Sequence, residues 1–147
     1  MPMIDVTFGE SLIPSSKDRE LGESLTKAVL HAEGVANPGS FHLNNTAAFI
    51  HRLPDSAVHT AAQGNAKNVR IQVCTPPHAL NREAQKKLTQ EATEIVARLS
   101  GDATLTTRTW VILNEAAEGG WGIAGTAYGV AEFTELAARA KAAAQGK

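Results

Sequence analysis

Residues 69–115 read VRIQVCTPPHALNREAQKKLTQEATEIVARLSGDATLTTRTWVILNE, an amphipathic stretch between two short apolar runs. Between positions 82 and 101, apolar residues recur every three or four positions, which predicts a helix with one buried face, formed by Leu88, Ala92, Ile95, Val96 and Leu99. Asn81 is predicted to cap the start of this helix, and Gly101 its end. The flanking runs predict strands, so the whole stretch is a β-α-β unit with parallel strands and a right-handed crossover.

The same order of elements occurs earlier in the chain, as MIDVTF (3–8), GESLIPSS (9–16), KDRELGESLTKAVLHAEG (17–34) and TAAFIHRL (46–53). Ser15 or Ser16 is predicted to cap the first helix, and Gly34 to end it. Internal repetition fixes the architecture. We expect one α+β (α/β) domain of two fused β-α-β units, about 2–55 and 68–125, forming a four-stranded mixed sheet with two helices on one face. A helix at about 130–144 follows.

The other face of this sheet has no helix to cover it. The segments AAFI (47–50) and WVIL (110–113) are too apolar to face water. We therefore expect this face to be buried in an oligomer.

Composition excludes several classes of protein. The net charge of −1 over 147 residues gives no electrostatic basis for binding nucleic acid. The chain has no apolar run long enough for a membrane span and no signal-peptide pattern, so we expect no membrane partner and a cytoplasmic protein. The single cysteine, Cys74, is predicted to lie buried in a strand. The histidines are scattered without metal-ligand spacing, and no nucleotide-binding motif occurs, so neither a metal nor a cofactor is expected.

Pro2 is the residue with the most distinctive chemistry. Removal of Met1 would leave its nitrogen as a free secondary amine, and burial would lower the affinity of that amine for a proton. An α-amino group ordinarily titrates near pH 8, so a desolvated one can act as a general base at neutral pH. The structural alternative is a proline at the start of a strand, where its missing N–H costs least.

A doubled β-α-β unit that begins at a penultimate proline and ends in WVILNEAAEGGWGIAG (110–125) resembles the tautomerase superfamily. The segment from Arg82 to Gly125 resembles most of a 4-oxalocrotonate tautomerase subunit. LIPSSK (12–17), with Trp110, Val111 and Glu115, is similar to the fused, two-unit cis-3-chloroacrylic acid dehalogenase. The trailing AEF (131–133) is similar to malonate semialdehyde decarboxylase. The resemblance implies a homotrimer with one amino-terminal proline, Pro2, at the active site of each chain.

The resemblance also indicates substrate-binding residues. A guanidinium could hold the carboxylate of an anionic organic acid, and the candidates are Arg70 and Arg108, ranked above Arg52. Trp121, in GGWGIAG, stands at the position of the family's active-site aromatic, and His31 near a histidine of the dehalogenase. Each has a structural alternative: solvated strand-end charges for the arginines, a plug in the trimer seam for Trp121, and a favourable charge at a helix C-terminus for His31.

The implied function is a cofactor-independent tautomerase or isomerase of a small 2-oxo or enol carboxylic acid, with Pro2 as general base. One alternative is a hydratase, dehalogenase or decarboxylase with protonated Pro2 as the acid; hydration needs a water activator, for which Glu115 and Glu118 are the nearby options. A third is a trimeric binding or scaffold protein with impaired catalysis. The family's arginines after each unit's first strand are replaced here by Leu12 and Leu80, which favours the third.

Overall fold

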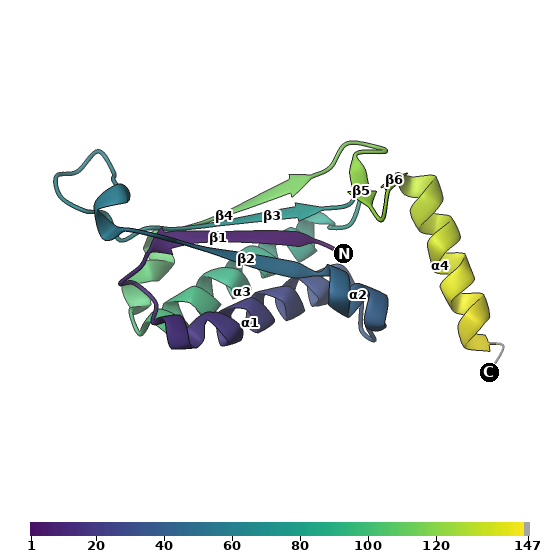
Figure 1. Ribbon diagram of the computed structural model, residues 1–147, viewed down its shortest axis with the longest axis horizontal. Helices are drawn as coiled ribbons and strands as arrows, with labels where there is room; N and C mark the ends of the chain where they lie inside the picture. Colours follow the sequence, from purple (N-terminus) through teal and green to yellow (C-terminus); the bar gives the residue numbers. More distant parts are fainter. Residues whose placement is uncertain (146–147) are drawn as a thin grey trace.

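The computed structural model describes residues 1–145, and in the last helix it gives the side chains up to Arg139 and that of Ala142. The first unit consists of β1 (Met3–Gly9), α1 (Asp18–Ala32) and β2 (Ala47–Leu53), and the second of β3 (Val69–Thr75), α3 (Arg82–Ser100) and β4 (Thr109–Glu115). The strands form one sheet in the order β2-β1-β3-β4 (Figure 1). Strands are parallel within each unit, and β1 and β3 meet antiparallel at the centre. The predicted fold class is confirmed.

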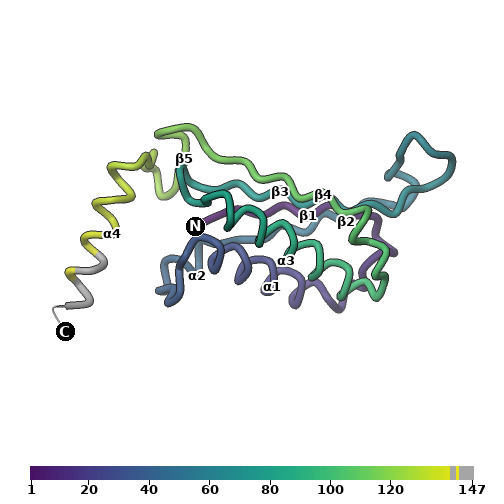
Figure 2. The backbone as a smooth tube through the Cα atoms, turned by 180° about the vertical axis from the view of Figure 1, so that it is seen from behind, coloured from purple at the N-terminus to yellow at the C-terminus, as the bar shows by residue number. Residues whose placement is uncertain are grey.

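The helices α1 and α3 cover the same face of the sheet (Figure 2). Alternate strand residues point toward them, as the two-residue period of a strand requires. The largest fully buried side chains include Ile4, Val6 and Phe8 of β1, Ile71 of β3, and Leu21, Leu25 and Leu88 of the helices. One continuous core therefore joins the two units.

The helix ends test the capping predictions. Asn81 caps α3 as predicted, its Oδ1 accepting a hydrogen bond from the Ala84 N–H at 2.9 Å, and Gly101 ends the helix with φ 72°. Gly34 has φ 75° just beyond α1. The prediction that Ser15 or Ser16 caps α1 is wrong: Ser15–Lys17 form a short 3-10 helix, and Lys17 precedes α1 without a side-chain cap.

The opposite sheet face is uncovered in this chain, as the sequence predicts, but it mixes apolar side chains with polar ones such as Asp5 and Arg70, because Ile50 and Val111 of the apolar runs turn toward the core. It exposes 43% of Met3, 49% of Phe49, 59% of Trp110 and 41% of Ile112. Cys74 pairs with Met3 and is half-buried on this face, so the prediction that it is buried is wrong. Its position one residue out of phase with inward-facing Val73 explains the difference.

Two small elements lie outside the sequence-based description. The helix α2 (Ser40–Asn45) lies before β2, and β5 (Trp121–Ile123) forms a hairpin with β6 (Thr126–Tyr128). Ala124 and Gly125 both have positive φ, the conformation of a tight two-residue hairpin turn. The helix α4 (Val130–Gln145) then extends away from the sheet (Figure 1).

Candidate functional site

Pro2 lies at the sheet end closed by α2 and the end of α1. It directly precedes β1 and is buried. Its carbonyl accepts a hydrogen bond from the N–H of Ala47, the first residue of β2, at 3.3 Å. Because proline has no N–H, this position leaves the sheet ladder intact and the Pro2 nitrogen free of it.

Met1 occupies a buried position beside Pro2. Its ammonium group is 3.3 Å from Oε2 of Glu33, and the two side chains are only 2% and 6% exposed. Glu33 follows α1 and directly precedes Gly34. Burial raises the pKa of the Glu33 carboxyl, and the charge of the Met1 ammonium partly offsets that rise. The chain terminus is therefore held in an enclosed ion pair rather than in solvent.

Sequence reasoning missed Glu33. It assigned this helix end to His31, which lies two residues earlier and is exposed. A signal was present, because a negative charge at a helix C-terminus is unfavourable without a specific partner. The terminal ammonium is that partner.

Two more polar side chains lie near the terminus. His42 of α2 has a lowered pKa, first because of burial and then because of the positive charge of the terminus. Thr46, which directly precedes Ala47, is 7% exposed. Neither its Oγ1 nor Oε1 of Glu33 has a hydrogen-bond partner among the described residues. Buried polar atoms without partners are rare enough to need an explanation.

The predicted arginines lie at the far end of the sheet within one chain. Arg70 pairs in register with Thr7, five residues along β1 from Pro2, or about 16 Å away. It is exposed on the uncovered sheet face, with one long contact of 3.4 Å to Thr7 Oγ1. Arg108 lies one residue before β4, and its Nη2 donates to Oδ2 of Asp102 at 2.8 Å.

Arg52 is also engaged. Its guanidinium pairs with Asp18 and donates to the carbonyl of Ile13 at 2.6 Å. Of these three arginines, Arg70 keeps the most exposed guanidinium, and the structure brings none of them to Pro2 within the chain.

Trp121 lies in β5, in the hairpin at the same sheet end as Pro2 (Figure 1). Its side chain is half-buried, and its indole Nε1 is buried with no hydrogen-bond partner in the part of the chain that the structure describes. The hairpin follows β4, whose last residue, Glu115, pairs with Thr75 beside the start of β1. The topology therefore places the predicted aromatic near the Pro2 end.

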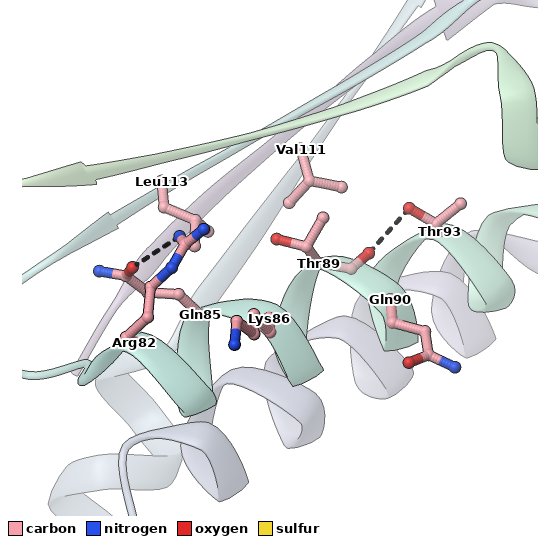
Figure 3. A pocket seen from close by; sticks show the side chains of 8 residues that line it. All are labelled: Arg82, Gln85, Lys86, Thr89, Gln90, Thr93, Val111 and Leu113. Atoms are coloured by element: carbon pink, nitrogen blue, oxygen red, sulfur yellow. Dashed lines mark hydrogen bonds between the residues drawn. The ribbon is translucent and has the colours of Figure 1, made fainter.

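A groove of about 610 Å³ lies elsewhere, between α3 and the outer edge strand β4 (Figure 3). It is polar, and its two cations already have partners: Arg82 contacts Gln85 at 3.4 Å, and Lys86 contacts Glu83 at 2.8 Å. Its lining residues are Arg82, Gln85, Lys86, Thr89, Gln90, Thr93, Val111 and Leu113. This groove does not include Pro2.

The part of the chain that the structure describes contains no group of three His, Cys, Asp or Glu side chains that could hold a metal ion. Among the same residues, every helix is too short or too polar to cross a membrane.

No protein family model matches this chain, and no curated protein matches it. Solved structures do. A wild-type fused 4-oxalocrotonate tautomerase, fused 4-OT, described as a symmetric trimer, matches with a TM-score of 0.70 at 17% identity, over 84% of this chain and 93% of that chain.

Pt0534, inactivated by 2-oxo-3-pentynoate, matches with a TM-score of 0.71 at 19% identity, over 88% of this chain and 97% of that chain. N1, a member of the cis-3-chloroacrylic acid dehalogenase family, matches with a TM-score of 0.66 at 16% identity, over 92% and 90%. These neighbours are tautomerase superfamily members, so the chain has the tautomerase superfamily fold. The resemblance seen in the sequence is confirmed at the level of the fold.

Proposed function

We propose that this protein is a cofactor-independent tautomerase or isomerase of a small 2-oxo or enol carboxylic acid, with Pro2 as general base after removal of Met1. The observation that supports it best is the place of Pro2, which is buried and directly precedes β1 at the sheet end that also holds the buried Met1–Glu33 pair. A secondary amine there is desolvated, which favours its neutral, basic form. Pro2 takes a proton from an enol oxygen or a carbon and returns it at another carbon.

The carboxylate of the substrate needs a cationic partner, and we propose Arg70 of a neighbouring chain. Arg70 is exposed on the uncovered sheet face, which also exposes Phe49 and Trp110 and which a homotrimer would cover. Arg108 is the weaker candidate because Asp102 already binds it. Trimers of fused 4-OT with this fold support that assembly. Trp121 would form an apolar wall of the pocket, and His31 its outer rim.

The second candidate is hydration, dehalogenation or decarboxylation of a small unsaturated acid, with protonated Pro2 as the acid. Glu33 favours it, since hydration needs a carboxylate to activate water and this one is beside the terminus. Conversely, a working protein that retains Met1 would have an acylated Pro2 and would be a binding or scaffold protein.

The test is ketonisation of phenylenolpyruvate, followed by ultraviolet absorbance, for wild type and Pro2→Ala. Intact mass first establishes whether Met1 is absent. Loss of the general base is expected to lower kcat by about 100-fold or more, whereas Pro14→Ala, at an exposed proline, keeps the wild-type rate. Equal rates for wild type and Pro2→Ala, or no rate above buffer, would reject the tautomerase.

A further inference from the structure

The buried ion pair at the amino terminus uses only half of its carboxylate. Oε2 of Glu33 contacts the Met1 ammonium at 3.3 Å, whereas Oε1 is buried without a hydrogen-bond partner among the described residues. The Glu33 side chain is 6% exposed. Burying an acceptor without a partner costs free energy. The free oxygen is thus suited to a group that this chain does not itself supply.

Removal of Met1 would bring the same carboxylate to Pro2. The Met1 and Pro2 nitrogens are separated by three covalent bonds, which hold them within about 3.7 Å of each other. Since Oε2 of Glu33 is 3.3 Å from the Met1 nitrogen, it lies within about 7 Å of the Pro2 nitrogen, and we expect its side chain to turn toward the Pro2 amine once Met1 is removed. The volume that the buried Met1 side chain fills would become open space next to both groups.

Thr46 provides a second polar atom on this side of the strand. Its Oγ1 is also buried and has no partner among the described residues, and Ala47, the next residue, donates to the Pro2 carbonyl. The space left by Met1 would therefore adjoin the Pro2 amine and the Glu33 carboxyl, and the Thr46 hydroxyl follows in the chain segment that pairs with Pro2.

We propose that Glu33 is a catalytic residue, the second proton carrier beside Pro2, and that the volume filled by Met1 is the inner pocket for the enol or 2-oxo acid. This inference rests on the proposed tautomerase function and deepens it. It assigns to the substrate a hydrogen-bonding enol or keto oxygen that lies between the amine and the carboxyl group.

The two groups share one proton, and the steps balance. Pro2, as the neutral amine, takes the enol proton: the O–H bond breaks, an N–H bond forms, and the oxygen electrons form the C=O bond. The C=C electron pair takes the proton of the Glu33 carboxyl, so that an O–H bond breaks and a C–H bond forms. Pro2 ammonium and Glu33 carboxylate remain, and a proton passes from nitrogen to oxygen to restore the pair.

The other titratable groups at this sheet end have partners of their own or favour their neutral form. Glu33 is therefore the main proton-carrying group beside Pro2. Asp5 points to the uncovered face and contacts His51 at 2.6 Å. Glu115 of β4 is exposed and 3.9 Å from His78. His42 of α2 is held toward its neutral form by burial and by the terminal charge, which lower its pKa. The raised pKa of Glu33 agrees with a carboxyl group that can carry the shared proton.

The experiment compares Met1-free wild type, Pro2→Ala, Glu33→Gln and Glu33→Asp, with Glu23→Gln as the matched control on the exposed side of α1. It measures kcat and KM for phenylenolpyruvate as a function of pH. It also measures the pKa of the Pro2 amine directly, from chemical shifts of ¹³C,¹⁵N-labelled proline.

Glu33→Gln is expected to lower kcat by about 100-fold with little change in KM. It should also lower the pKa of Pro2 by about one unit, because a carboxylate contact favours the ammonium. Glu33→Asp keeps the carboxyl group and part of the rate, and it serves if the Gln variant fails to fold. Glu23→Gln behaves as wild type.

The outcomes separate the two proposals. An inactive Pro2→Ala beside a fully active Glu33→Gln with an unchanged Pro2 titration would overturn the role of Glu33 and leave the tautomerase standing. If the wild type has no activity, the proposed tautomerase function is rejected, and the titration of Pro2 alone tests whether Glu33 contacts its amine. A Pro2 pKa that is the same with and without the Glu33 carboxylate would then overturn that contact.

Discussion

The two β-α-β units share strands, crossover and core, but they begin differently. The second unit starts at Val69, whose N–H donates to the Arg108 carbonyl at 3.0 Å. The first starts behind Pro2, which has no N–H to give, and behind it the terminal amine is held by Glu33. The first residue of the second unit therefore donates its N–H to the fold, whereas the Pro2 nitrogen of the first unit has no hydrogen to donate.

Their helices differ in the same sense. α3 has a side-chain cap at its start and a left-handed glycine at its end. α1 has no side-chain cap and places the carboxylate of Glu33 at its C-terminus, against the helix dipole. Departures from local stability rules are expected where a site is built, and the first unit shows them where Pro2 lies.

The largest expected effects come from the shared core and test whether the units are one cooperative body. Leu21 of α1 and Leu88 of α3 are both fully buried. Replacing either by Ala should lower the free energy of unfolding by about 3 kcal/mol, through lost burial and a cavity. Urea denaturation followed by circular dichroism measures this. A biphasic transition in only one variant would show that the units unfold separately.

The next largest effect on stability is expected at Arg52 of the first unit. Its side chain is 20% exposed, pairs with Asp18, donates to two backbone carbonyls and lies 5.0 Å from the Phe8 ring centre. Arg52→Met should cost about 2 kcal/mol, because it removes charged hydrogen bonds to partly buried groups. The control is Arg98→Met, whose exposed pair with Glu20 should cost less than about 1 kcal/mol. Equal losses would contradict a structural role for Arg52.

The fold could be predicted from the sequence because the repeated apolar periods fix both units and their faces. The site could be predicted only in part. Pro2 can be recognised from its residue type and position, but the contact of Glu33 with the terminal amine depends on the fold, since 32 positions separate Glu33 from Met1. Arg70 and Arg108 show the converse: their alignment suggests a shared site, and the strand register places them far from Pro2 in the same chain.

A smaller effect on stability tests the side-chain cap that α3 of the second unit has and α1 of the first unit lacks. Asn81→Ala removes the hydrogen bond to the Ala84 N–H and should cost about 1 kcal/mol. Lys17→Ala, at the corresponding position before α1, removes no cap and only an exposed contact to Glu20, so we expect a few tenths, at most about 1 kcal/mol. Thermal unfolding of both variants measures the difference, and a Lys17 variant less stable than the Asn81 variant would reverse the comparison.

The smallest net effect is the pH dependence that the enclosed terminus gives to the form retaining Met1, because two contributions oppose each other. Burial raises the pKa of Glu33 above its ordinary 4.5. Between pH 4.5 and the raised pKa, the native state holds more protons than the unfolded chain, so the free energy of unfolding falls as pH rises. The pKa of His42 is lowered below its ordinary 6.5, so there the unfolded chain holds more protons, and stability rises with pH.

Single variants should expose each contribution alone. In the Met1-retaining form, Glu33→Gln leaves the His42 contribution, and the midpoint of urea unfolding should rise with pH up to about 6.5. His42→Gln leaves the Glu33 contribution, and the midpoint should fall as pH rises above about 4.5. Identical pH profiles for both variants would contradict the opposite pKa shifts that burial gives to Glu33 and His42. Opposite slopes would instead locate the pH response of the protein in the first unit, at the buried groups beside the amino terminus.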